Sequence, residues 1–151
     1  MPLIHVSQSK LIPAAPGRVY AIIADYTAGH VQILPRRYFS NIKIEQGGVG
    51  AGTVIRFQMH AFGSTQEMQA EITEPIPGEL LVETIAQTAA TTSFRVVPDS
   101  GGQASRVTIS TDWKTTGLLG WVQSLLIPRL LRKVYAEELD NLASVVTAAG
   151  V

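Results

Sequence analysis

The hydrophobic and polar positions of the 151-residue chain follow two periods, one typical of strands and one typical of helices. Alternation with a period of two predicts a first strand over residues 3–12 and six later strands separated by short, turn-rich breaks. The six later strands are expected over residues 39–45, 52–62, 65–73, 79–86, 91–97 and 106–114. Because strands joined by turns this short must run antiparallel, the pattern predicts a single antiparallel sheet of seven strands.

Apolar residues spaced three and four positions apart predict helices in three places. Two short helices are expected between the first and second strands, in GRVYAIIADY and in TAGHVQILP. A long helix is expected over residues 116–147, with Thr116 as its N-cap, because apolar residues recur along one face as far as Val146. This helix is the only element able to cover the apolar face of the sheet. The predicted fold class is therefore α+β, with the seven-stranded antiparallel sheet wrapped around a long C-terminal helix.

The glycine-rich stretch EQGGVGAGT, residues 45–53, has part of the spacing of a phosphate-binding loop. Gly47 and Gly52 are spaced as in that motif, but Thr53 occupies the lysine position, and the residues that follow have the period of a strand. The dinucleotide-binding pattern is also incomplete, since its third glycine is missing. We therefore interpret the stretch as a turn between two strands in which glycines adopt positive φ, and we expect no nucleotide binding.

Composition narrows the classes of function. Twelve Lys and Arg balance twelve Asp and Glu, so the chain lacks the basic patch of a nucleic-acid-binding protein. There is no cysteine, and His5, His30 and His60 do not have metal-ligand spacing, so neither a metal nor a cofactor is expected. The N-terminus does not resemble a signal peptide, and no stretch is long and apolar enough to span a bilayer. A cytoplasmic location and a single domain over residues 1–151 are expected.

The inner face of the predicted sheet is mostly apolar. Alternation directs Phe57, Met59 and Met68 toward the helix and places charged residues such as Glu67 on the opposite face. An apolar pocket with a few polar groups is the usual form of a small-molecule site. The residues expected to contact a ligand are Tyr20, His30, Phe57, Met59, Met68, Phe94, Ile109, Trp113, Trp121 and Tyr135.

The titratable residues do not form a recognisable catalytic set in the sequence. Neither a base with an orienting partner nor a pair of carboxylates stands out, so no catalytic residue is assigned. His30 is the best functional candidate among the histidines, although its polar surroundings favour a position on the surface or at a helix cap. His60 is expected on the outer face of the sheet.

The start of the long helix is apolar on all sides. Between Leu118 and Ile127, apolar residues that include Trp121 encircle the helix, and Pro128 is expected to kink or interrupt it. Such a surface has to be covered by a bound ligand, by a second subunit in a homodimer or by transient contact with a membrane. We predict that this segment is a mobile gate over the mouth of the cavity.

The chain resembles the helix-grip superfamily known as SRPBCC over essentially its whole length. The resemblance rests on the order of elements and on the segments APGRVYAIIADY, GGVGAGT, ITEPIPGELLVE, TTSFRV, TDW, GLLGWV and LLRKVYAEELDNL. This superfamily includes START lipid-transfer domains, pollen allergens, coenzyme Q-binding proteins and polyketide cyclase/dehydratases. The resemblance implies a protein that binds a hydrophobic small molecule, such as a lipid, isoprenoid or polyketide, in an internal cavity. The alternatives are a cyclase/dehydratase-like enzyme that uses the same cavity and a domain that dimerises or binds a partner through its apolar helix start.

Overall fold

The computed structural model describes residues 3–114 and 120–149, with side chains in the last helix from residue 125 onward. The strands are β1 (Leu3–Ile12), β2 (Phe39–Gln46), β3 (Val54–Ala61), β4 (Ser64–Ile76), β5 (Leu80–Ile85), β6 (Thr91–Asp99) and β7 (Ala104–Lys114). The helices are α1 (Pro16–Ala24), α2 (Gly29–Ile33) and α3 (Gly120–Ala149), with a short 3-10 turn at Ser100–Gly102.

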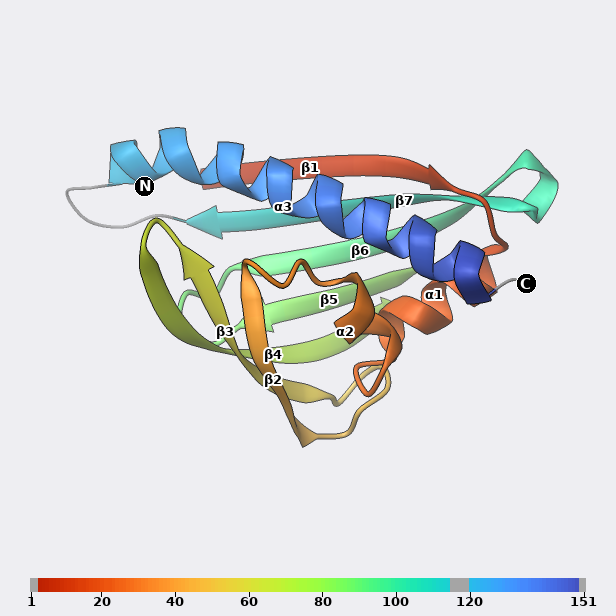
Figure 1. Ribbon diagram of the computed structural model, residues 1–151, viewed down its shortest axis with the longest axis horizontal. Helices are drawn as coiled ribbons and strands as arrows, with labels where there is room; N and C mark the ends of the chain where they lie inside the picture. Colours follow the sequence, from red (N-terminus) through yellow and green to blue (C-terminus); the bar gives the residue numbers. More distant parts are fainter. Residues whose placement is uncertain (1–2, 115–119, 150–151) are drawn as a thin grey trace.

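The strands form one antiparallel sheet in the order β1-β7-β6-β5-β4-β3-β2. The sheet curves, and α3 runs along its concave side, packed beside β1 and against α2 (Figure 1). The two short helices lie between β1 and β2 in the chain and sit at the C-terminal end of α3. The predicted helix-grip architecture is therefore confirmed.

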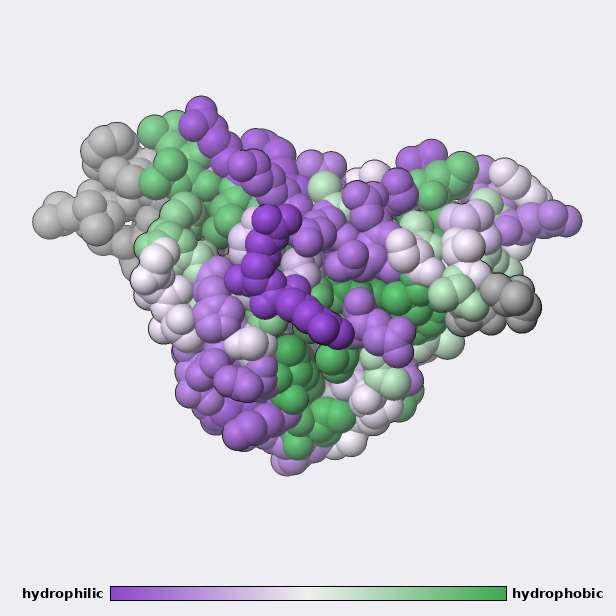
Figure 2. All heavy atoms as spheres, in the orientation of Figure 1, coloured by the Kyte–Doolittle hydropathy of each residue, from purple (hydrophilic) through white to green (hydrophobic). Residues whose placement is uncertain are grey.

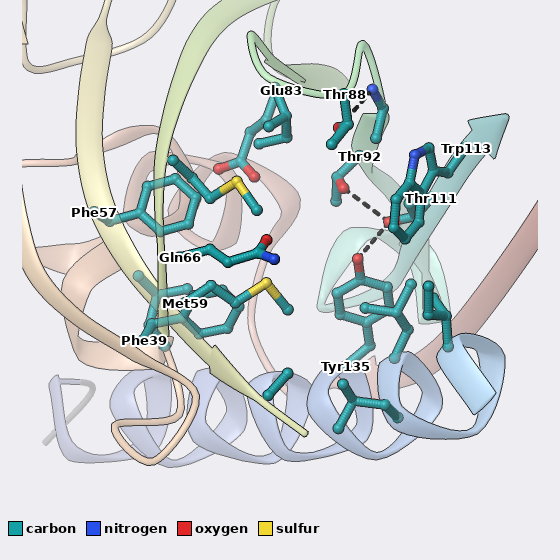
Figure 3. A pocket seen from close by; sticks show the side chains of 18 of the residues that line it. Phe39, Phe57, Met59, Gln66, Glu83, Thr88, Thr92, Thr111, Trp113 and Tyr135 are labelled. Carbon is teal, nitrogen blue, oxygen red and sulfur yellow. Dashed lines mark hydrogen bonds between the residues drawn. The ribbon is translucent and has the colours of Figure 1, made fainter. Parts of the chain in front are cut away.

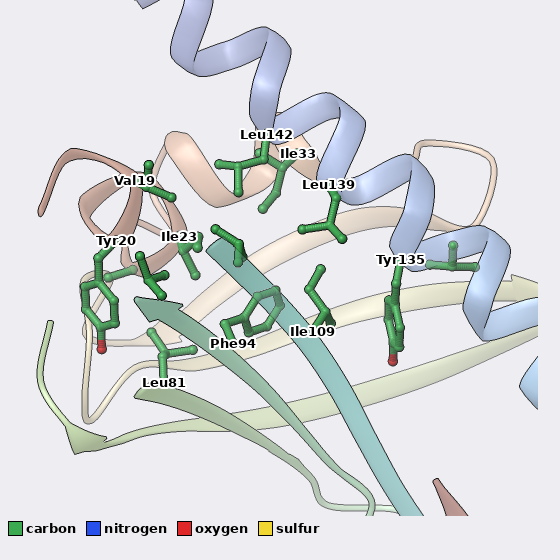
Figure 4. Packing of buried hydrophobic residues seen from close by; sticks show 14 of the residues in the cluster. Val19, Tyr20, Ile23, Ile33, Leu81, Phe94, Ile109, Tyr135, Leu139 and Leu142 are labelled. Carbon is green, nitrogen blue, oxygen red and sulfur yellow. The ribbon is translucent and has the colours of Figure 1, made fainter. Parts of the chain in front are cut away.

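The two faces of the sheet have the side chains that alternation predicts. Phe94, Ile109 and Ile72 are buried on the inner face, whereas Glu67 and Arg95 are exposed on the outer face. The inner-face residues pack with α1, α2 and the inward side of α3 into one hydrophobic cluster (Figure 4). This packing fills the half of the concave face that lies next to α1 and α2.

Two features differ from the expected elements. β4 extends to Ile76 and so includes Pro75, which is accommodated because the register with β5 shifts between Thr73 and Ile76. α3 continues as one helix through Pro128, so the interruption expected as the alternative to a kink is wrong. A proline removes only one backbone hydrogen bond, and buried residues such as Ile127 and Leu131 hold the helix on both sides of it. The proposed N-cap Thr116 lies outside the described residues.

No helix among the described residues is long and apolar enough to cross a membrane.

The glycine-rich stretch connects β2 to β3, as predicted, and its backbone is bonded to neighbouring segments. The amide of Tyr26 donates to the carbonyl of Gly48 at 2.8 Å, and the amide of Gly50 donates to the carbonyl of Ala24 at 2.9 Å. The Glu74 carboxylate accepts from the amide of Ala51 at 2.7 Å and from the hydroxyl of Tyr20 at 2.6 Å. The loop is thus fixed to the end of α1, at the side of the concave face that α1 and α2 cover.

Replacing Gly50 with alanine is expected to lower the free energy of unfolding by about 2 kcal/mol or more. Gly50 has φ +67°, and a Cβ there would lie 2.3 Å from a carboxylate oxygen of Glu74. The control is Gly52→Ala, since Gly52 has φ +88° with no atom within 4 Å of the added Cβ; it should cost only about 1 kcal/mol. Urea denaturation measures both values, and equal costs would show that the Glu74 contact is unimportant.

Candidate functional site

A cavity of about 440 Å³ lies between the concave face of the sheet and α3. Figure 3 shows side chains from β3 and β4 on one side of this space and from β6, β7 and α3 on the other. Most of its wall is apolar. The apolar wall consists mainly of Phe39, Ile55, Phe57, Met59, Met68, Ile85, Phe94, Trp113, Ile127, Leu130 and Leu131.

The mouth of the cavity lies between the β3–β4 hairpin and the start of α3. The lining residues there are exposed, including Phe62 at 64% and Leu126 at 43% exposure, together with Ser64 and Gln66. At the other end, His30, Phe94 and Glu138 line the cavity and are almost completely buried. Within the part of the chain that the structure describes, the cavity therefore has an open end, which we call the mouth, and an inner end beneath α1 and α2.

A polar cluster occupies the inner end. The hydroxyl of Tyr26 donates to Oε2 of Glu83 at 2.6 Å, and Nε2 of His30 lies 3.4 Å from the same oxygen. The imidazole of His30 stacks on the ring of Tyr26, with the ring centroids 4.2 Å apart. Glu83 comes from β5, whereas Tyr26 and His30 come from the α1–α2 region, so the cluster joins the sheet to the short helices.

Local backbone geometry places His30 in this cluster. Gly29 allows α2 to pack closely on α1, because a Cβ at this position would lie 2.6 Å from the carbonyl oxygen of Ile22. His30 Nδ1 then donates a hydrogen bond to the carbonyl of Ile23 at 2.7 Å. This bond orients the ring so that Nε2 faces Glu83 and the cavity.

Burial controls the protonation of the cluster. Desolvation lowers the pKa of His30 below its ordinary value, despite the opposing effects of Glu83 and the Ile23 carbonyl. Burial also raises the pKa of Tyr26 well above its ordinary value, and the neighbouring Glu83 carboxylate raises it further. The neutral imidazole and the neutral phenol are therefore the favoured forms at the inner end.

A second carboxyl group, that of Glu138 on α3, also lines the inner end. Glu138 is 2% exposed, and burial raises the pKa of its carboxyl well above the ordinary value, with a smaller contribution from the charge of Glu83. Within the described part of the chain, no side chain forms a hydrogen bond or ion pair with it. No lysine or arginine is among the described residues lining the cavity.

Three hydroxyl groups follow one another along the wall formed by β6, β7 and α3. Thr92 and Thr111 are hydrogen-bonded at 2.8 Å, and Thr111 is hydrogen-bonded in turn to Tyr135 (Figure 3). Burial raises the pKa of Tyr135, so its hydroxyl stays protonated. This row adds neutral polar groups to a wall that is otherwise apolar.

Seven of the ten residues expected to contact a ligand are brought together around the cavity. They are His30, Phe57, Met59, Met68, Phe94, Trp113 and Tyr135. Ile109 is buried but does not line the cavity, because it pairs with Phe94 across β6 and β7 within the packed part of the core. Tyr20 is also away from the cavity, since its hydroxyl is bonded to Glu74 near the β4–β5 turn. The side chain of Trp121 lies outside the described residues.

The sequence-based interpretation of the polar residues needs two corrections. His30 is 1% exposed, so the expected surface or cap position is wrong; the close packing of α2 on α1 buries its ring. The expected lack of converging titratable groups is also wrong, because Tyr26, His30, Glu83 and Glu138 meet at the inner end. His60 lies on the outer face as expected, bonded to Ser40 and Thr65.

The two glutamates had a signal in the sequence. Glu83 alternates with Leu81 and Ile85 along β5 and therefore shares their inward direction. Glu138 follows Tyr135 by three positions and precedes Leu142 by four, so it lies on the buried stripe of α3. An acidic residue at a position that periodicity assigns to the core is a candidate for a functional group.

Comparison with known proteins agrees with this architecture. The KanY protein, solved by NMR, is 27% identical over 97% of this chain and 99% of its own, with a TM-score of 0.82. A START superfamily protein from Mycobacterium smegmatis is 16% identical over 96% and 98%, with a TM-score of 0.76. Norcoclaurine synthase from Thalictrum flavum, a point mutant solved with a transition-state analogue, is 14% identical over 99% and 98%, with a TM-score of 0.78. The last two likenesses concern the fold alone.

Sequence comparison identifies the family. No curated protein matches the chain. The family described as polyketide cyclase / dehydrase and lipid transport matches residues 4–147, nearly the whole length. With a sheet and helix arranged as in the solved relatives, the chain belongs to the polyketide cyclase/dehydrase and lipid-transport family.

Proposed function

We propose that this protein binds a hydrophobic small molecule, of the lipid, isoprenoid or polyketide kind, in the cavity between the sheet and α3. The observation that carries the proposal is the cavity of about 440 Å³, whose wall is mostly apolar and whose carboxyl groups, those of Glu83 and Glu138, lie at its inner end. Small-molecule sites commonly combine an apolar wall with a few placed polar groups. Membership of a family that includes lipid-transport proteins supports the same function.

The rim of the mouth supports a transient apolar contact while the ligand is loaded. Phe62, Leu125 and Leu126 are 64%, 57% and 43% exposed. Figure 2 shows hydrophobic residues gathered on this face toward the start of α3. Exposed apolar side chains beside a cavity can shield a hydrophobic molecule from water as it moves in from a membrane. The same side chains can be covered by a second subunit. Flotation with phospholipid vesicles tests membrane contact, and the mass of the protein in solution tests dimerisation.

The function is tested by native mass spectrometry of the purified protein, followed by extraction of whatever is bound. A co-purifying apolar molecule, or saturable binding of the neutral fluorescent probe N-phenyl-1-naphthylamine, is the expected result. A purified protein that carries no small molecule and does not bind the probe would contradict the proposal.

Gln66→Trp is expected to weaken probe binding at least about tenfold, because a bulky ring there fills the space that the probe needs. Gln66 lines the cavity opposite Tyr135 and Thr111 and is exposed, so the substitution does not disturb the core (Figure 3). The control is Glu67→Trp, the next residue, which faces solvent on the other side of β4 and should leave the affinity within about twofold. Fluorescence titration compares the two variants, and equal losses would place the probe elsewhere.

A second candidate is an enzyme of the cyclase/dehydratase kind that uses the same cavity. It is favoured by His30, whose Nδ1 is anchored to the Ile23 carbonyl so that Nε2 lies beside Glu83 and faces the cavity. A neutral imidazole held in this way is suited to accept a proton from a bound molecule. Chromatography and mass spectrometry of the ligand after incubation with the protein distinguish the two functions. An unchanged mass and retention time supports binding alone. Loss of water, or a product of the same mass with a different retention time, supports a reaction.

A further inference from the structure

The inner end of the cavity carries acidic groups without a matching cation. Glu83 and Glu138 both line it, from β5 and α3. Among the described residues that line the cavity there is no lysine or arginine, and the salt bridges that involve arginine or lysine lie on the surface. A buried carboxylate is unfavourable unless it is paired or neutralised. The described residues at the inner end therefore provide no positive charge to balance a carboxylate there.

The hydrogen-bonding capacity of this end is also one-sided. His30 uses its Nδ1 proton on the carbonyl of Ile23, so Nε2 of the neutral ring is an acceptor. Tyr26 uses its proton on Glu83. The second oxygen of Glu83 and both oxygens of Glu138 have no partner within the described part of the chain. Most of the polar atoms at the inner end thus accept hydrogen bonds, and the neutral carboxyl of Glu138 supplies a single proton.

The geometry favours an organic cation rather than a metal ion. Within the described residues, no three His, Asp or Glu side chains are arranged to hold a metal. The wall around the polar cluster is instead formed by apolar and aromatic side chains such as Phe94 and Leu131. A group that is charged at one end and apolar over the rest matches both parts of the surface.

We propose that the ligand of this cavity is a hydrophobic amine, which enters with its protonated nitrogen first and donates hydrogen bonds to Glu138 and Glu83. The inference rests on the proposed function, because it specifies the chemical class of the molecule that the cavity encloses. An ammonium group supplies both the missing charge and the missing donors, and hydrogen bonds between charged groups are the strong ones. A carboxylate ligand would meet like charge, and a neutral alcohol would supply a single donor.

Binding of an amine is coupled to release of a proton. Glu138 is buried, and its raised pKa favours the neutral form. The titratable groups that face it are Glu83 on β5, His30 on α2, Tyr26 before α2 and Tyr135 on α3, and none of them supplies a positive charge at neutral pH. A bound ammonium stabilises the Glu138 carboxylate, so the carboxyl loses its proton when the complex forms.

The experiment uses three ligands of one shape: 2-naphthylmethylamine, 2-naphthylmethanol and 2-naphthoic acid. Isothermal titration calorimetry at pH 7, repeated in buffers of different ionisation enthalpy, gives the affinity and the number of protons released. The amine should bind at least about tenfold more tightly than the alcohol, and the acid should bind most weakly. Up to one proton should be released with the amine and none with the alcohol.

Glu138→Gln tests the role of the buried carboxyl. It should reduce the affinity for the amine about tenfold, leave that for the alcohol within about twofold and abolish the proton release. The control is Asp140→Asn, which makes the same carboxyl-to-amide change on the solvent side of α3, where Asp140 forms an exposed ion pair with Lys10. Circular dichroism shows that each variant is folded, and the ligand series on the wild-type protein needs no variant.

The outcomes separate this inference from the function on which it rests. If the alcohol binds as tightly as the amine and no proton is released, the cavity binds apolar molecules but the amine class is wrong. If the amine retains its advantage in Glu138→Gln, the nitrogen is not held at the inner end, and the inference also fails. If neither the three ligands nor N-phenyl-1-naphthylamine binds, the proposed function itself is wrong.

Discussion

Replacing Phe94 with alanine is expected to lower the free energy of unfolding by about 3 to 5 kcal/mol, the cost typical of removing a buried aromatic side chain. Phe94 is 1% exposed and pairs with Ile109 across β6 and β7. Its ring meets that of His30 edge-on, with the centroids 5.3 Å apart. The large effect is expected because these contacts lie on the packed side of the ring, and the cavity on its other side cannot collapse to replace them. Urea denaturation followed by circular dichroism gives the value.

The matched control is Phe62→Ala, which removes the same ring from the β3–β4 hairpin. Phe62 is 64% exposed, so its loss should change the free energy of unfolding by no more than about 0.5 kcal/mol. If Phe94→Ala costs no more than Phe62→Ala, the ring of Phe94 does not support the core, and the interior of the domain is packed differently.

Glu138→Gln is expected to stabilise the ligand-free protein, by an amount that grows with pH. Burial raises the pKa of the folded carboxyl above the ordinary value of 4.5, so the folded state holds the proton after the unfolded chain has lost it. In the wild-type protein, the contribution of the Glu138 carboxyl to the free energy of unfolding is fully present below its pKa in the unfolded chain. This contribution is lost as the pH rises through its pKa in the folded state. Each unit between the two pKa values corresponds to about 1.4 kcal/mol. Glutamine does not titrate, so its advantage appears above pH 4.5.

Denaturation curves collected from pH 4 to pH 8 test this dependence. The effect of His30, whose lowered pKa opposes protonation in the folded state at low pH, is present in both proteins and largely cancels. Asp140→Asn, on the exposed side of the same helix, should show no comparable trend with pH. A difference between Glu138→Gln and the wild type that stays constant over the range would mean that Glu138 is not neutralised by burial.

The fold can be predicted from the sequence because each strand shows the alternation of apolar and polar residues over consecutive positions. The alternation that buries Ile55 and Phe57 while leaving Arg56 more exposed can be read from consecutive residues. The turn at the glycine-rich stretch is also local, since all the glycines in it have positive φ. The overall helix-grip architecture required only the additional fact that one long helix must cover one apolar face.

The apolar part of the candidate site is predictable for the same reason, but its polar end is not. Tyr26, Glu83 and Glu138 come from three elements and meet only after the sheet has curved and α2 has packed on α1. Two tyrosines six residues apart, Tyr20 and Tyr26, cannot be told apart by residue type, yet one bonds Glu74 outside the cavity and the other bonds Glu83 within it. Periodicity gives the direction of a side chain, whereas the identity of its neighbours depends on tertiary packing.

The backbone bonds between the glycine-rich loop and the end of α1 have a kinetic consequence. They fix the loop beside Tyr26 at the inner end, while exposed lining residues such as Gln66 and Leu126 mark the mouth. In the described part of the cavity, a molecule then enters and leaves through the mouth, so the molecule that reaches Glu83 first is also the last to leave. If two small molecules occupy the cavity together, they must bind in a compulsory order, and an excess of the outer one slows the escape of the inner one.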